Sequence, residues 1–177
     1  MINIKGQVEI RVLDAVTLEV LDVKIQDNVI TRKFYNDWAN TTSPITTYLY
    51  ISTINVPNTE DWIHVRGCDT TGFLPSGVTS PRFYAAAGAD PAYIQITRRF
   101  GAPAATRQIY TVLLSTDTNT DTPFTSYRAS AYVTFSTPCT QTSSQILDVY
   151  YRMQASSDTT YSYNNYAYSA IQSLNAL

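Results

Sequence analysis

Two short segments in which apolar and polar residues alternate constrain the fold of this chain most. They are Gln7–Val12 and Leu21–Gln26. Alternation with a period of two is the pattern of a β-strand that buries one of its faces. Between the segments, Asp14 and Thr17 carry side chains that hydrogen-bond to nearby backbone, as in a tight turn. The sequence therefore predicts a β-hairpin over residues 1–31.

Further segments have the composition of short strands and are separated by turn residues. They are Tyr48–Ile51, Ile63–Arg66, Tyr93–Thr97, Gln108–Leu114, Arg128–Phe135 and Gln145–Met153. Short strands in this number are typical of a sandwich. We therefore expect an all-β fold, an antiparallel β-sandwich of the jelly-roll or Ig-like type. Thr31, followed by Phe34, Tyr35 and Trp38 at helical spacing, predicts one short helix.

The chain divides by composition into two parts. Residues 1–155 hold the strand candidates and are predicted to form one β-sandwich domain. Gly and Pro recur between residues 67 and 91, which predicts a long irregular insertion in that domain. Residues 156–177 are rich in Tyr, Ser and Asn, and we expect them to form a C-terminal assembly tail.

The charge content and the length of the apolar runs argue against two classes of partner. The chain has 12 Lys and Arg against 14 Asp and Glu, and charged residues make up 15%, against about 25% in an average domain. No cluster of basic residues could follow a phosphate backbone, so we expect no nucleic-acid partner. No apolar run approaches the roughly 18 residues of a membrane span, so we expect no membrane partner.

The two cysteines, Cys68 and Cys139, are predicted to be free, buried thiols.

Candidate metal sites are incomplete. Asp117–Asp121 matches the start of a calcium loop, but Thr122 stands at the position of the required Gly and Arg128 at that of the bidentate Glu. His64 and Cys68 are too few ligands to close a zinc site. We therefore expect no metal and no cofactor.

No catalytic constellation emerges either. His64 is the single histidine, and the chain has no nucleophile elbow, phosphate-binding loop or dinucleotide fingerprint. Glu60 and Asp61 precede Trp62, as in some sugar-cleaving sites. Neighbouring residues on an extended chain point to opposite faces, so this pair would not straddle one bond. We expect no catalytic residues.

The 14 tyrosines carry the most functional information. Tyr buries a large ring and keeps a polar tip, which suits protein interfaces. Tyr93 and Tyr132 fall on the polar side of their strands and are predicted to lie outside the core. The predicted assembly contacts are in the tail: Tyr161, Tyr163, Tyr166, Tyr168, Ile171 and Leu174.

Two segments together resemble structural proteins of tailed bacteriophages. Gly6–Thr17, continuing to Asp27–Thr31, is similar to their opening strand, D-A-x-T turn, second strand and N-x-I-T step. The second segment comprises Arg98–Phe100, Thr106–Leu114 and Thr137–Arg152, and it resembles their C-terminal half. There an R-x-F step and a strand precede a P-I-T-K-T-like turn, and Cys139 and Gln141 stand where that turn has Ile and Lys.

The resemblance implies a non-enzymatic virion component, either a tail-fibre or collar protein or a capsid decoration. Its partners would be other virion proteins and copies of itself, and it would be made in the host bacterial cytoplasm. Two alternatives stay open. One is a receptor- or glycan-binding module at a fibre tip, with Trp62, Phe73 and Tyr84 stacking on host sugars. The other is a small polysaccharide-cleaving enzyme.

Overall fold

The computed structural model describes residues 4–30, 48–53, 55, 64–65, 68–69, 82–84, 93–115, 127–128 and 131–155. In this part of the chain every regular element is a β-strand, and every strand pairing is antiparallel. The expected all-β, antiparallel fold is therefore confirmed. The predicted helix after Thr31 and the tyrosine tail of residues 156–177 lie outside the described residues.

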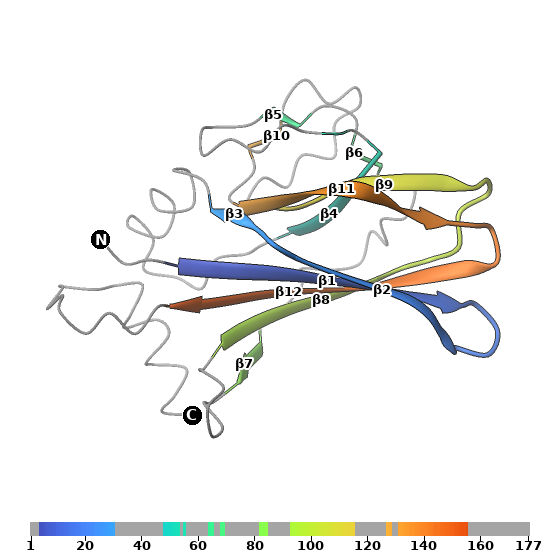
Figure 1. Ribbon diagram of the computed structural model, residues 1–177, viewed down its shortest axis with the longest axis horizontal. Helices are drawn as coiled ribbons and strands as arrows, with labels where there is room; N and C mark the ends of the chain where they lie inside the picture. Colours follow the sequence, from blue (N-terminus) through green and yellow to red (C-terminus); the bar gives the residue numbers. More distant parts are fainter. Residues whose placement is uncertain are drawn as a thin grey trace, which may run out of the picture.

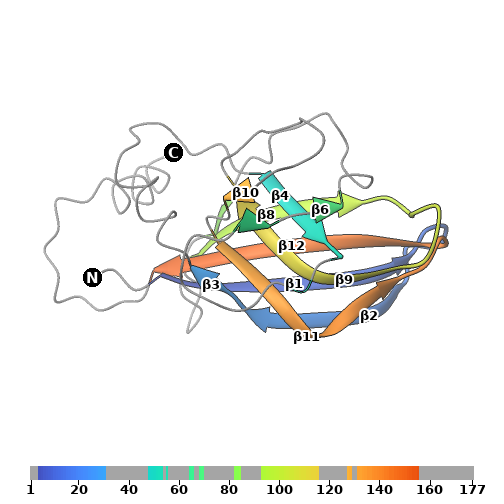
Figure 2. The same cartoon turned by 90° about the horizontal axis from the view of Figure 1, so that it is seen from above.

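The strands form two five-stranded sheets, which lie as two layers (Figure 1, Figure 2). Sheet I has the order β2(Val20–Asp27), β1(Ile4–Asp14), β12(Gln145–Ala155), β8(Tyr93–Phe100) and β7(Arg82–Tyr84). Sheet II has the order β3(Val29–Ile30), β11(Ala131–Gln141), β9(Arg107–Ser115), β4(Tyr48–Ser52) and β6(Cys68–Asp69). A two-stranded pair, β5(His64–Val65) with β10(Tyr127–Arg128), lies on the outer side of sheet II (Figure 1).

One hydrophobic core lies between the facing sides of the two sheets. In sheet I the core side chains include Val8, Ile10 and Val12 of β1, which are the apolar half of the alternation. The other members are Leu49, Ile51, Ile96, Phe100, Ile109, Val112, Leu114, Ala131, Val133, Phe135, Cys139, Leu147, Val149, Tyr151 and Met153. Each large apolar side chain buried here contributes about 1.5–3 kcal/mol to stability. As the alternation predicts, β1 directs its apolar side chains into the core.

The turn between β1 and β2 forms where the sequence predicts it. Asp14 Oδ1 accepts hydrogen bonds from the backbone N–H groups of Val16 and Thr17, both at 2.8 Å. Thr17 Oγ1 accepts from the N–H of Glu19 at 3.3 Å. Leu18 has a φ of 60°, a left-handed conformation that is costly for a residue with a Cβ. The Asp and Thr side chains thus hold a turn that strains Leu18.

The chain passes from sheet I to sheet II at Asn28, between β2 and β3. The Asn28 N–H donates to the Gly6 carbonyl at 2.9 Å, and its side-chain Nδ2 donates to the Tyr151 hydroxyl. A Cβ on Gly6 would overlap the Asn28 side chain, so glycine is required for this approach. The crossover therefore depends on contacts to two strands of sheet I.

Strand β11 extends farther than the sequence predicts. The composition predicts a strand that ends at Phe135 and the resemblance implies a turn around Cys139 and Gln141, but β11 continues to Gln141. Its register with β9 shifts between Thr134 and Cys139, and Pro138 lies inside that irregularity. Proline cannot donate to a strand ladder, so a bulge is where a strand tolerates it. The turn itself follows, with the N–H of Gln145 donating to the Thr142 carbonyl at 3.1 Å.

Sheet II is buried on both faces where Tyr50, Leu113 and Tyr132 lie, which corrects one prediction. Tyr132 was expected outside the core, yet it is 0% exposed. It lies opposite Leu113 of β9, which in turn lies opposite Tyr50 of β4, and all three are buried on the side away from sheet I. The alternation of β11 therefore separates two buried faces, so a polar-side position there is not a solvent position.

Several other predictions meet the structure only in part. Cys139 is a free, buried thiol, as predicted, whereas the side chain of Cys68 lies outside the description. Burial raises the pKa of the Cys139 thiol to about 11. Within residues 67–91 the described residues form two short strands, β6 and β7.

Candidate protein-contact surface

Strand β2 presents its apolar side chains to solvent. The register places Ile25 opposite Glu9 and Val23 opposite Arg11. Because Val8, Ile10 and Val12 point into the core, Glu9 and Arg11 lie on the outer face of sheet I, and so do Val23 and Ile25. Leu21, Val23 and Ile25 are 51%, 45% and 57% exposed. This direction is the reverse of the one that a half-buried strand would have.

The polar half of β2 points inward and bridges the two sheets. Gln26 Nε2 donates to the Thr134 carbonyl at 2.8 Å, and Lys24 Nζ donates to the Thr137 carbonyl at 3.4 Å. These acceptors lie on β11 where its register with β9 shifts. Polar side chains on β2 therefore satisfy carbonyls at the irregular part of β11. With these polar side chains directed at β11, the apolar side chains of β2 point away from the core.

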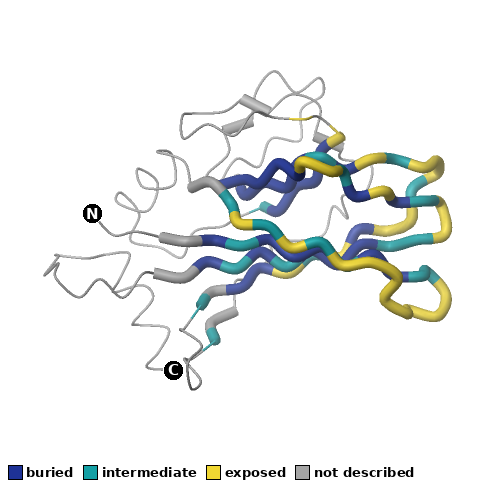
Figure 3. The backbone as a smooth tube through the Cα atoms, in the orientation of Figure 1, coloured by how far each residue is buried: buried dark blue, intermediate teal, exposed yellow. Residues whose placement is uncertain are grey.

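The exposed apolar residues are concentrated on one hairpin. Within the described part of the chain, the exposed large apolar side chains are Val16, Leu18, Val20, Leu21, Val23 and Ile25. We call these six residues the apolar edge. They follow β2 and the preceding turn as one exposed stretch at the margin of sheet I (Figure 3). A concentration of this kind marks an interaction surface more often than single exposed residues do.

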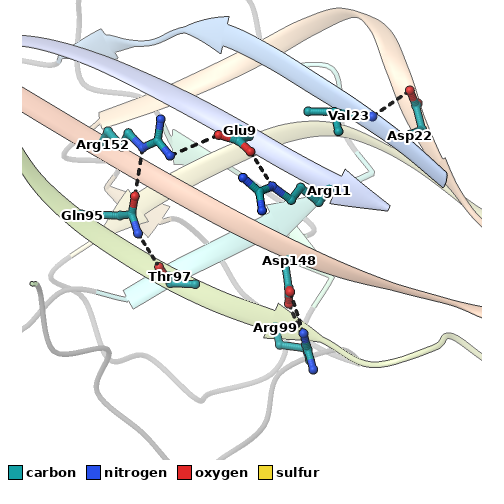
Figure 4. Close-up of polar contacts among 9 residues, drawn as sticks. All are labelled: Glu9, Arg11, Asp22, Val23, Gln95, Thr97, Arg99, Asp148 and Arg152. Atoms are coloured by element: carbon teal, nitrogen blue, oxygen red, sulfur yellow. Dashed lines mark hydrogen bonds and ion pairs between the residues drawn. The ribbon is translucent and has the colours of Figure 1, made fainter. Parts of the chain in front are cut away.

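A row of charged and polar side chains lies next to the apolar edge, on β1, β12 and β8 (Figure 4). Glu9 lies between two guanidinium groups: Arg11 Nε is 2.5 Å from Oε1, and Arg152 Nη2 is 3.3 Å from Oε2. Arg152 Nε donates to Gln95 Oε1 at 2.9 Å, and Gln95 Nε2 donates to Thr97 Oγ1 at 3.2 Å. These ties hold the outer face of sheet I in one arrangement across three strands.

A second ion pair on this face is bidentate. Arg99 Nε and Nη2 donate to Oδ1 and Oδ2 of Asp148 at 2.7 and 2.6 Å (Figure 4). The hydrogen bonds that Arg99 donates to Asp148, together with the negative charge of that carboxylate, raise the pKa of Arg99. The Asp148 side chain is 10% exposed and that of Arg99 is 51% exposed, so the guanidinium is the part available to a partner.

Tyrosine rings accompany the arginines. The Arg11 guanidinium lies 4.7 Å from the centroid of the Tyr150 ring, and that of Arg152 lies 5.5 Å from that of Tyr93. Tyr93 also stacks on Tyr84 of β7, with centroids 4.7 Å apart and an interplanar angle of 13°. Tyr93, predicted outside the core, is partly exposed on this face.

Most of the residues that the sequence singled out as sites lie outside the described part of the chain. Tyr84 stacks on Tyr93, whereas Trp62, Phe73, Glu60 and Asp61 lie outside the described residues. So do the six predicted tail contacts and the loop at residues 117–121. In the part of the chain that is described, three or more His, Cys, Asp or Glu side chains nowhere gather as a metal site would require. No helix there is long and apolar enough to cross a bilayer.

Comparisons with known proteins add no information about this surface. Neither protein-family models, nor characterised proteins, nor solved structures match this chain. Sequence reasoning missed the apolar edge as a site, although its signal was present in Leu21, Val23 and Ile25. Alternation shows that a strand has two different faces, but it does not show which face meets the core.

Proposed function

We propose that this chain is a non-enzymatic structural component of a tailed bacteriophage virion, and that it acts through protein–protein assembly contacts. A tail-fibre, collar or capsid decoration protein would fit. The observation that carries the proposal is the apolar edge, six exposed apolar side chains on one hairpin. Without a partner to cover them, these side chains contribute little to stability, and polar residues could replace them. The virion setting comes from the resemblance of residues 6–31 and 98–152 to phage structural proteins.

The composition of the neighbouring face supports an interface. Tyr and Arg are among the residues most enriched at the energetic centres of protein contacts. Here Arg11, Arg99 and Arg152 share the outer face of sheet I with Tyr93 and Tyr150. Ion pairs and ring contacts already order these side chains, so a partner would lose little entropy in fixing them.

The proposal extends to the fold and to the tail. Two antiparallel five-stranded sheets around one core support a β-sandwich, which we propose is of the jelly-roll or Ig-like type. We also propose that the tail contributes contacts through Tyr161, Tyr163, Tyr166, Tyr168, Ile171 and Leu174. A chain that ends at Ser157 should then enter virions less well than the full chain.

The decisive test is incorporation into particles. Purified virions of the virus that encodes this chain should contain it, as detected by mass spectrometry. The L21S/V23S/I25S variant should be depleted from them at least about tenfold, since it removes three apolar contacts. A matched control is A102S/A104S/A105S, which changes three exposed alanines in the loop between β8 and β9. Equal incorporation of both variants would contradict a role for the apolar edge.

One observation favours the alternative function, a receptor- or glycan-binding module. Tyr84 and Tyr93 form a stacked pair with Arg152 beside them, and sugar rings bind to aromatic faces with polar groups nearby. A glycan array probed with the full chain would detect this activity, and Y84A should abolish the signal. The L21S/V23S/I25S variant should leave it unchanged, which separates glycan binding from assembly.

A further inference from the structure

We propose that two copies of this chain pair through β2, antiparallel about a twofold axis at Val23, so that two copies of sheet I become one ten-stranded sheet. This inference rests on the proposed assembly function and names one partner for the apolar edge. Among the described strands, β2 pairs with β1 alone, so its other side is an open strand edge. Open edges recruit further strands because their backbone groups lack partners.

The backbone of β2 offers the correct groups at Val23 and Ile25, beyond the register shift that sets Val20 opposite Leu13. Asn28 donates to the residue directly opposite it, Gly6, so these two form a hydrogen-bonded pair. In an antiparallel ladder such pairs recur at every second residue, which makes Gln26, Lys24 and Asp22 the residues bonded to β1. The N–H and C=O groups of Val23 and Ile25, the two residues between them, therefore point to the open edge.

At the open edge of β2, the backbone N–H of Val23 bonds to a side chain of its own strand. The N–H of Val23 donates to Oδ1 of the adjacent Asp22 at 2.9 Å (Figure 4). In the proposed pair, Val23 would exchange two N–H···O=C bonds with Val23 of the second copy. The carboxylate of Asp22 would then no longer accept from the Val23 N–H and could pair with a cation.

The side chains of β2 are complementary to themselves in this register. With Val23 opposite Val23, Asp22 of each copy lies opposite Lys24 of the other, which gives two ion pairs on one face. These are the non-hydrogen-bonded positions, where opposing side chains are closest. On the outer face, Leu21 of each copy lies opposite Ile25 of the other. The exposed apolar side chains of the two strands then cover one another.

Charge discriminates against the neighbouring registers. A slip of two residues in one direction centres the pair on Asp22 and sets the two Asp22 carboxylates against each other. A slip in the other direction centres it on Lys24 and opposes two ammonium groups. Like charges directly opposite are destabilising. Beyond residues 21–25 the preferred register would oppose Glu19 and Asp27, so the pairing is confined to these five residues.

Charge exchange tests the partner. In the full chain, D22K and K24D should each weaken self-association about tenfold or more, because each variant puts like charges opposite one another twice. An equimolar mixture of the D22K and K24D chains should associate again, since each then supplies the charge that the other lacks. The D22K/K24D double variant should also regain association. Analytical ultracentrifugation measures all four, and thermal melting verifies that each variant is folded.

Cysteine pairs test the register. Opposing residues of an antiparallel pair are close enough for a disulfide. Under mild oxidation the V23C chain should form a linked dimer by itself. L21C and I25C should not do so alone, but their mixture should. The wild-type chain under the same oxidation controls for Cys68 and Cys139.

The outcomes separate this inference from the proposed function. Cross-linking of V23C, together with L21C–I25C cross-linking only in the mixture, supports the twofold pair. A monomeric chain, or one whose association ignores the charge variants, overturns it. If that monomeric chain still needs Leu21, Val23 and Ile25 to enter virions, the assembly function stands with another protein as partner. A chain that pairs in solution but is absent from virions overturns the function and leaves the pair.

Discussion

At the scale of single residues, Asn28 shows how one side chain can hold a change of sheet. Its Nδ2 donates to the hydroxyl of Tyr151, which is fully buried in the core. Burial raises the pKa of Tyr151 well above its usual range, and the hydrogen bond from Asn28 opposes this effect more weakly. The hydroxyl therefore stays protonated, and it depends on Asn28 as a hydrogen-bond partner.

Removing that partner should be costly. We predict that N28A lowers the free energy of unfolding by about 1–3 kcal/mol, because it leaves a buried hydroxyl without its partner. In the N28A background, Y151F should recover part of the loss, since the orphaned group is then gone. Urea unfolding of the two single variants and the double variant gives the coupling energy. Strict additivity of the two changes would contradict this interpretation.

Leu18 gives a second prediction at this scale, because it has a φ of 60° without being glycine. A left-handed conformation costs an ordinary residue about 1–2 kcal/mol, and glycine avoids most of that cost. We therefore expect L18G to raise the free energy of unfolding by about 0.5–1 kcal/mol. The matched control is L21G on β2, where glycine should instead destabilise the strand. Urea titrations compare the two, and destabilisation by L18G would refute the argument.

At the scale of elements, the turn between β1 and β2 should respond to pH through Asp14. The N–H groups of Thr17 and Val16 bond to its carboxylate and lower its pKa. Between the folded and unfolded pKa values the unfolded chain binds more protons, so stability rises with pH in that window. The contribution is complete above the unfolded value of about 4 and is lost as the pH falls through the folded value.

The variant D14N isolates this charge, because its amide oxygen can still accept both hydrogen bonds. We expect the wild type to melt at a higher temperature than D14N at pH 7. The difference should narrow as the pH falls from about 5 to 3. Thermal unfolding followed by circular dichroism at several pH values measures this. A gap that stays constant or widens in acid would show that the Asp14 charge is not the cause.

Elements also show where sequence reasoning succeeds and where it fails. The hairpin and its turn were predictable because alternation and the Asp–Thr turn chemistry are local signals. The outward direction of Val23 and Ile25 was not, since it depends on β11 carbonyls more than a hundred residues away. The burial of Tyr132 was missed for a similar reason. It reflects burial of the outer face of sheet II around Tyr50, Leu113 and Tyr132, which no single strand encodes.

At the scale of the whole molecule, the buried thiol of Cys139 reports on global unfolding. It is 0% exposed in the shared core, and burial raises its pKa to about 11. In a C68S background at pH 8, we expect it to react with a thiol reagent at least about a hundredfold more slowly in the folded chain than in urea, because little thiolate forms and access is closed. Equal rates would show that the core opens readily.

The position of β1 in sheet I has a consequence for how this protein is made. β1 lies between β2, its neighbour along the chain, and β12, with Ile4 opposite Ala155. The hairpin can form as soon as residue 27 has emerged from the ribosome, but the centre of the sheet forms only after β12, the last described strand, has been made. Pairing across such a span slows folding, because a long loop must close before any contact compensates for it. Throughout most of translation, then, one edge of β1 has no strand to pair with, because its partner β12 has not yet been made.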